Sequence, residues 1–274
     1  MKKPFLRIIL YMMIMVGSQI LASLVVGVLC CGGDLQSMSL AEADNAMLEA
    51  IYANQTLLLL ISYGIVVLVL CLLALKNRIS LIQYTGLHRK STGKPIVLAM
   101  LLGLASCFWV SFAVALAPWP EAWISDYSQA SSVLTTSSPL LDAAATVLFG
   151  PIIEEVLFRG LIYDTLLTVT PAGVAVVMQA ILFGGVHSGP IWMIYAFVVG
   201  CALGYVRKRT GSLWPCLGMH IAFNGSSYLF GLFAQQLGSN GMVIVLAFLG
   251  SAAAVIALLF ALQRCTTPEA PTAA

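Results

Sequence analysis

The chain has 274 residues, of which 60% are hydrophobic and 9% are charged, and its formal net charge is +2. A soluble globular domain carries about 25% charged residues, so this composition excludes a soluble globular protein and indicates an integral membrane protein. The small net charge also gives no sign of a nucleic-acid-binding surface, because the basic residues are explained by membrane topology.

Apolar segments long enough to form membrane helices recur along the whole chain. A membrane-spanning helix needs about 20 apolar residues, and the alternation that is typical of strands is missing. The sequence therefore predicts an all-α, polytopic membrane protein with about eight transmembrane helices. Their expected ranges are 7–29, 56–75, 95–117, 140–163, 171–187, 190–206, 213–235 and 242–263.

The first of these segments follows Met1, Lys2 and Lys3, as the apolar part of a secretory signal would. Its apolar part is longer than the roughly 7 to 15 residues of a signal peptide, and no convincing small-x-small cleavage site follows it. We therefore interpret this segment as a retained first transmembrane helix.

The basic residues predict the orientation. If the N-terminus is cytoplasmic, all 13 Lys and Arg residues fall on the inner side, at segment ends or in inner loops. The outer loops, at about 30–55 and 118–139, carry acidic residues and are long enough for short interfacial helices. Because basic residues set the orientation of membrane proteins, we expect both termini in the cytoplasm and a protein of the plasma (inner) membrane.

The chain divides into three parts. Residues 1–139 hold three transmembrane helices and the outer loops, residues 140–263 hold the polar motifs described below, and residues 264–274 form a tail that we expect to be disordered. No internal repeat is visible, which argues against a transporter built from inverted repeats. The seven cysteines are scattered, odd in number and free of CxxC pairs, so we interpret them as small core residues.

Three ionisable residues interrupt the fourth apolar segment: Glu154, Glu155 and Arg159 in GPIIEEVLFRG. Each such group near a bilayer centre costs roughly 2.5 to 3.5 kcal/mol, so the cluster is expected to serve a function. Residues four apart share a helix face, so Glu155 and Arg159 are expected to form an ion pair. Glu154 is rotated by about 100° from Glu155 and is left for chemistry. A purely structural ion-pair cluster is the alternative.

Two further polar motifs lie in later apolar segments. Phe183 and His187 are four residues apart in FGGVH, and His220 and Asn224 are four apart in HIAFN. The second pair offers two adjacent donors, which could stabilise an oxyanion by roughly 3 to 4 kcal/mol each. As structural links between helices they would contribute only about 0.6 to 2 kcal/mol.

Other polar residues are given no special role. Asp142 and Asp164 fall near the outer and inner interfaces, and His88 stands beside basic residues in an inner loop.

The two motif histidines are expected at different depths in the membrane. His187 lies roughly 24 Å from the expected inner end of its segment, whereas His220 lies only about 11 Å from its own. Either the helices are tilted and staggered or the expected boundaries are wrong, and we favour the second explanation.

The ordered set EExxxR, FxxxH and HxxxN resembles the CAAX-processing and bacteriocin-processing (CPBP) family of intramembrane proteases. This family includes the type 2 CAAX prenyl endopeptidases and abortive-infection-like bacterial proteins. The motifs run from Glu154 to Asn224. The resemblance therefore covers about the second half of the chain, where residues 140–263 would form the catalytic helical core, and the first three helices contribute nothing to it.

The resemblance implies an intramembrane endopeptidase that hydrolyses peptide bonds. Glu154 with His187 would activate a water molecule, and His220 with Asn224 would stabilise the oxyanion. Glu155, Arg159 and Phe183 would support these residues. The substrate would be a membrane-embedded or lipidated peptide or protein within the lipid bilayer, and no nucleic acid is involved.

Two alternatives stay open. No cofactor is expected, but Glu154, His187 and His220 are ligand types that zinc accepts, so a metalloendopeptidase-like site is the first alternative. The second is a non-catalytic membrane protein, either an immunity factor or a proton-coupled carrier, because intramembrane carboxylates and histidines also serve proton relays.

Overall fold

The computed structural model describes residues 4–31, 38–132, 138–237 and 240–266. Every regular element in these ranges is a helix, which confirms the all-α, polytopic fold class. Most of the eight expected apolar segments correspond to single helices. These are α1 (Pro4–Cys31), α3 (Gln55–Lys76), α5 (Gly93–Leu116), α10 (Ala172–Gly185), α11 (Pro190–Thr210), α12 (Leu213–Leu237) and α13 (Gly241–Cys265).

The fourth expected segment is a continuous helical run that we call the central helix, residues 139–166. It changes its hydrogen-bonding pattern several times along its length. Its parts are α7 (Pro139–Ala143), the π-helix η2 (Ala144–Phe149), α8 (Gly150–Glu154), the π-helix η3 (Glu155–Ile162) and α9 (Tyr163–Leu166).

Five helices of the described residues are both long and apolar enough to cross a membrane: α1, α3, α5, α11 and α13. By contrast, α10 has 14 residues. At 1.5 Å per residue it is about 21 Å long, which is less than the hydrocarbon core of about 30 Å. The segment expected at 171–187 is therefore shorter than a full span.

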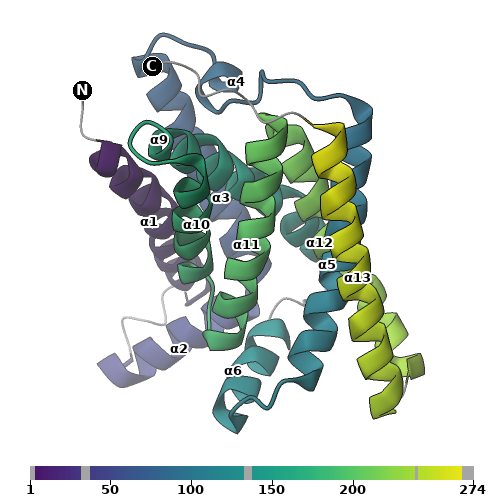
Figure 1. The fold of residues 1–274 in the computed structure, drawn as a ribbon. Coiled ribbons are helices and arrows are strands. Elements are labelled where there is room, and N and C mark those ends of the chain that lie inside the picture. The colour runs from purple at the N-terminus through teal and green to yellow at the C-terminus, as the bar shows by residue number, and fades with distance from the viewer. Residues whose placement is uncertain (1–3, 32–37, 133–137, 238–239, 267–274) are drawn as a thin grey trace.

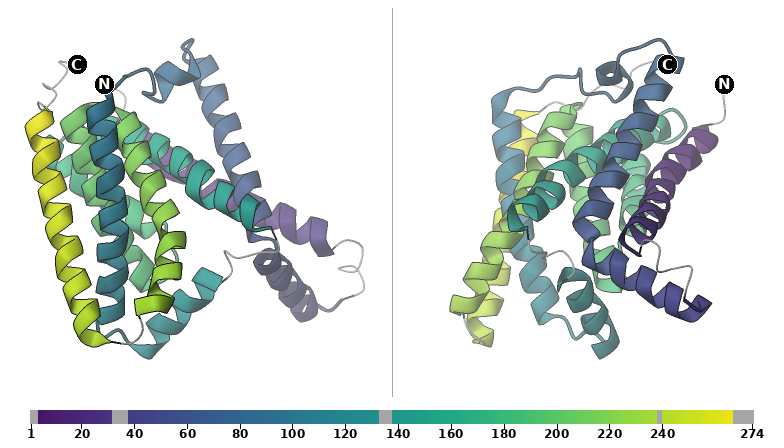
Figure 2. Two further views of the ribbon diagram at one scale, coloured as in Figure 1. Left: turned by 90° about the vertical axis from the view of Figure 1, so that its right-hand side faces the viewer. Right: turned by 180° about the vertical axis from the view of Figure 1, so that it is seen from behind.

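The helices pack around the central helix (Figures 1 and 2). Helix α5 lies between α12 and α13, α1 packs against α3, and α10 packs against α11. The central helix runs obliquely between these groups and contacts α1, α3, α10, α11 and α12. Its polar residues are consequently enclosed by other helices instead of facing lipid.

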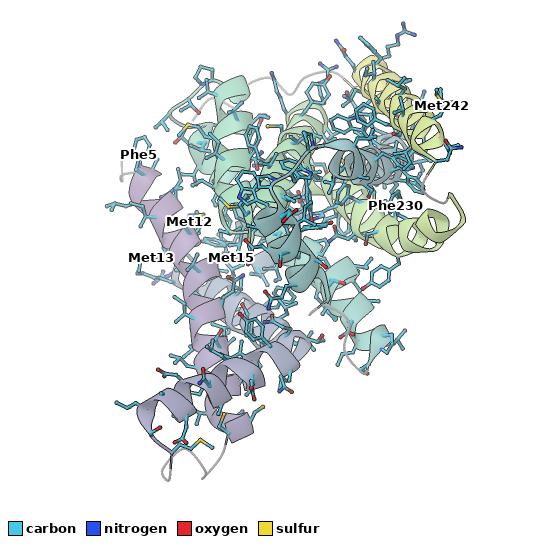
Figure 3. All side chains as sticks on the ribbon, turned by 90° about the horizontal axis from the view of Figure 1, so that it is seen from below. Phe5, Met12, Met13, Met15, Phe230 and Met242 are labelled. Atoms are coloured by element: carbon cyan, nitrogen blue, oxygen red, sulfur yellow. The ribbon has the colours of Figure 1, made fainter. Side chains whose placement is uncertain are left out.

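Apolar side chains cover the outside of the bundle, as in a protein surrounded by lipid. On α1, Phe5 is 59% exposed and Met13 is 66% exposed, whereas Met15, which faces the core, is 3% exposed (Figure 3). Soluble monomeric proteins rarely expose such a large apolar surface, so this pattern agrees with an integral membrane protein.

Two short helices lie in the expected outer loops. Helix α2 (Leu40–Ala53) begins with a capping box between Ser39 and Glu42, and α6 (Glu121–Ser132) follows α5. Both lie at the end of the bundle opposite to the start of α1 and the end of α13 (Figure 1). The short helix α4 (Leu81–Tyr84) and the basic last turn of α11 lie at the same end as the start of α1. The basic residues therefore gather at one end of the molecule.

The helix boundaries agree with the expected ones to within two residues for α10, and α12 begins at Leu213 as expected. These two boundaries therefore do not account for the mismatch in depth between His187 and His220. His187 lies beyond the end of α10, in the turn that leads to α11. At the other end of the chain, α13 extends through Arg264 and Cys265 into the expected tail, while residues 267–274 lie outside the described residues.

The orientation of this bundle in the membrane stays a prediction. Reporter fusions at Lys90 and Lys208 are expected to report the cytoplasm, because basic loops are retained on that side. Fusions at Glu42 and Asp126 are expected to report the opposite side. One basic loop found outside would contradict the proposed orientation.

Candidate active site

The two π-helical stretches of the central helix flank Glu154. The amide of Gly150 donates to the carbonyl of Ala145, five residues back, and Pro151 has no amide hydrogen to donate. Both Phe149 and Gly150 keep right-handed helical dihedral angles, so the wider turn accommodates the proline without leaving the helix. Such π-helical turns occur often at functional sites.

The ion pair expected between Glu155 and Arg159 is present. Arg159 Nη1 lies 2.9 Å from Glu155 Oε1, and both side chains are completely buried. Arg159 Nη2 also donates to the carbonyl of Gly200 on α11 at 3.3 Å, and its guanidinium stacks 4.3 Å from the ring centre of Phe183. The guanidinium therefore links the central helix to both α10 and α11.

His220 bridges the two glutamates. Its Nδ1 lies 2.8 Å from Glu155 Oε1, and its Nε2 lies 3.5 Å from Glu154 Oε2. An ionised carboxylate only accepts hydrogen bonds, so Nδ1 carries a hydrogen when Glu155 is ionised. The remaining nitrogen then faces Glu154, and this contact is favourable when either Nε2 or Glu154 carries a proton.

His187 approaches the same site from the turn that follows α10. Its Nδ1 lies 2.7 Å from the carbonyl of Phe183, which can only accept, so Nδ1 is the donor and Nε2 of the neutral ring is left as an acceptor. The ring of Phe183 makes edge contacts with His187 and with His220 at centroid distances of 4.8 and 5.8 Å. Phe183 therefore contacts both imidazoles.

Asn224 is oriented by the central helix. Its Nδ2 donates to the carbonyl of Thr146 in η2 at 2.9 Å. The two expected oxyanion donors therefore already make other contacts. His220 faces both glutamates, and Asn224 donates one amide hydrogen to the backbone. The second amide hydrogen of Asn224 stays available for a substrate.

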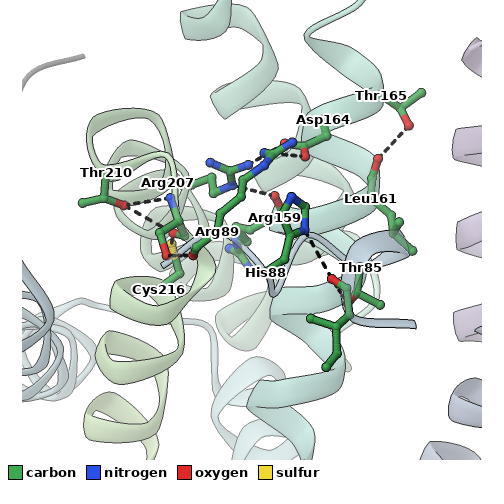
Figure 4. Close-up of polar contacts among 12 residues, drawn as sticks. Thr85, His88, Arg89, Arg159, Leu161, Asp164, Thr165, Arg207, Thr210 and Cys216 are labelled. Carbon is green, nitrogen blue, oxygen red and sulfur yellow. Dashed lines mark hydrogen bonds and ion pairs between the residues drawn. The ribbon is translucent and has the colours of Figure 1, made fainter. Parts of the chain in front are cut away.

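Asp164 has an ion-pair role that the sequence did not reveal. Its carboxylate lies between Arg89 and Arg207, at 2.9 and 2.8 Å (Figure 4). Arg207 is 2% exposed, and its Nε donates to the carbonyl of Arg159 at 3.2 Å. The expectation that Asp164 needs no special role is therefore wrong, because it fixes the C-terminal end of the central helix to α11 and to the loop that carries Arg89.

The same loop closes against Gly160. A Cβ atom at position 160 would lie 2.6 Å from the carbonyl of Thr85, so only glycine fits this approach.

Asp142, like Asp164, is expected from the sequence to have no special role, yet it is 2% exposed and accepts a hydrogen bond from Thr56. Both aspartates pair with residues far away in the sequence, so no local pattern could have indicated their partners.

The alternative zinc set is not assembled in this structure. No three His, Cys, Asp or Glu side chains among the described residues form a group that could hold a metal ion. His220 directs its two ring nitrogens at Glu155 and Glu154. The choice between a metal-free site and a zinc site stays a prediction.

The fold and the site define an all-α polytopic membrane protein with carboxylates and imidazoles enclosed by its helices. A family profile described as Type II CAAX prenyl endopeptidase Rce1-like matches residues 136–226. This range contains all three motifs. The match supports the expected relationship to the CPBP family.

One curated relative is similar to part of the chain. The Bacillus subtilis protein described as "Putative membrane peptidase YdiL" is 27% identical over 135 residues. The match covers 47% of this chain and 55% of the relative, so the chain spans about half of the relative's length. No solved structure matches the chain.

Proposed function

We propose that the protein is an intramembrane endopeptidase that cleaves membrane-embedded or lipidated peptides with a water molecule activated by Glu154 and His187. One observation carries this proposal. His220 contacts both Glu154 and Glu155, and the ring of Phe183 contacts both His220 and His187. All of these residues lie inside the region that matches the peptidase family.

The geometry supports a sequence of proton transfers. Glu154 and the free Nε2 of His187 are both acceptors, so together they hold and deprotonate a water molecule. The water oxygen forms a bond to the peptide carbonyl carbon, and the carbonyl oxygen takes the negative charge. The C–N bond then breaks, and the proton taken from water passes to the leaving amine.

The negative oxygen of the intermediate needs donors. The open amide hydrogen of Asn224 supplies one, and its carboxamide is already fixed by the bond to Thr146. Nε2 of His220 supplies the second when it is protonated beside Glu154. Glu155 and Arg159 hold this arrangement, because one carboxylate oxygen of Glu155 binds both Arg159 and His220.

The proposal is tested with purified protein and a panel of membrane and lipidated peptides, measured by mass spectrometry of the products. Wild type is expected to cleave at least one peptide, and a chelator is expected to leave the rate unchanged. A rate lost with the chelator and restored by zinc would move the assignment to the metal alternative. No cleavage across the panel would favour the non-catalytic alternative.

Asn224→Ala is expected to lower kcat by roughly 10² to 10³ while KM stays close to its wild-type value, the loss expected for one oxyanion donor. Steady-state kinetics on a cleaved peptide measures both constants. Asn77→Ala, a change in the loop after α3, is the matched control and should leave kcat unchanged. A rise in KM with kcat preserved would instead assign Asn224 to substrate binding.

A further inference from the structure

Tyr63 brings a hydroxyl group from the N-terminal half of the chain to the central helix. It lies on α3, outside the region that matches the peptidase family, and packs against the core formed by the central helix. A Cβ atom placed on Gly150 would lie 2.8 Å from Tyr63 Oη and 3.6 Å from Tyr63 Cζ. The hydroxyl therefore occupies the space that a side chain at position 150 would fill.

Glu154 comes four residues after Gly150 within α8, so the two positions share one helix face. Side chains on a helix lean towards its N-terminus, over the preceding turn. The carboxylate of Glu154 therefore leans towards the place that Tyr63 Oη occupies. An electrostatic interaction between Tyr63 and Glu154 agrees with this placement.

Both groups have unused hydrogen-bonding capacity. Tyr63 Oη makes no hydrogen bond to another residue in the described part of the chain. Glu154 contacts His220 at 3.5 Å, and 16% of its side chain is exposed. A half-buried tyrosine hydroxyl and a carboxylate that face each other in this way are suited to share a bound water molecule.

We propose that Tyr63 is a positioning residue of the active site, which orients the Glu154 carboxylate through a shared water molecule. This inference rests on the proposed function. It assigns to α3 a part in the site that the three motifs do not contain, and it explains why position 150 holds glycine.

The placement is tested without any activity measurement, by a double-mutant cycle on the melting temperature in detergent. Gly150→Ala is expected to lower Tm in the wild type, because its new methyl group meets Tyr63 Oη. In the Tyr63→Phe background the nearest ring atom would be Cζ at an ordinary contact distance, so the same change should lower Tm less. The 3.2 Å contact with the Ala145 carbonyl is common to both backgrounds and cancels. Equal losses in both backgrounds would overturn the placement.

The role is tested by kinetics on a peptide that the wild type cleaves. Tyr63→Phe is expected to lower kcat about 10- to 100-fold with KM within about twofold, because the hydrogen bonds that orient a charged group are lost. Tyr52→Phe, on the outer helix α2, is the matched control and should cleave at the wild-type rate. Wild-type kcat in Tyr63→Phe would overturn the positioning role and leave the proposed function standing. A wild type that cleaves nothing would overturn both.

Discussion

Glu154→Gln is expected to abolish peptide cleavage, with a loss of more than about 10²-fold in kcat, because the amide cannot take a proton from water. The substitution keeps the shape of the side chain, so the melting temperature should stay near that of the wild type. Product formation on a cleaved peptide, measured together with Tm, separates these effects. Glu49→Gln on α2, where the side chain is exposed, is the matched control.

His187→Ala belongs to the same prediction and should cause a similar loss, because it removes the free Nε2 acceptor beside Glu154. His88→Ala is its control, since that ring is exposed in the basic loop. Retained cleavage by Glu154→Gln would rule out this residue as the base. Retained cleavage by His187→Ala alone would leave Glu154 as the base and remove His187 from the mechanism.

Arg159→Ala is expected to destabilise the protein by about 3 to 5 kcal/mol, the loss found when one partner of a buried ion pair is removed. The carboxylate of Glu155 would keep its contact with His220 but would lose the fixed positive charge. The stacking on Phe183 and the bond to the Gly200 carbonyl would be lost as well. Protein yield and the melting temperature in detergent measure the effect.

The double change Glu155→Gln with Arg159→Gln should recover part of that stability, because no unpaired charge stays buried. Arg264→Ala, at an exposed position in the last turn of α13, is the matched control and should leave Tm unchanged. A melting temperature in Arg159→Ala equal to that of the wild type would contradict the structural role of the pair.

Much of the fold followed from hydropathy, because long apolar segments have few options other than helices in a membrane. The pair of Glu155 and Arg159 was also predictable, since helical spacing brings residues four apart together even in a π-helical stretch. The exact ends of the helices were predicted less accurately. Helix α10 ends at Gly185, two residues before the expected end at 187, and the polar and turn-forming residues His187, Ser188 and Gly189 follow it.

The contacts between helices could not be predicted from the sequence. His220 faces Glu154 and Glu155, which are more than 60 residues earlier in the chain, and this changes the role expected for its two nitrogens. Arg207 carried the same signal as its neighbours Lys208 and Arg209, namely a basic residue at an inner helix end. Only the packing of α11 on the central helix distinguishes it, by burying its side chain against Asp164.

The π-helical turns of the central helix also limit how its length can change. Each residue of a regular helix turns the following side chains by about 100°, so losing one residue from η3 between Glu155 and Arg159 would swing the guanidinium away from its carboxylate. The same loss after Arg159 would leave the ion pair intact but carry Asp164 away from Arg89 and Arg207. Alignments of relatives should therefore place no gaps within 155–164, and chimeras that exchange this helix should keep its residue count.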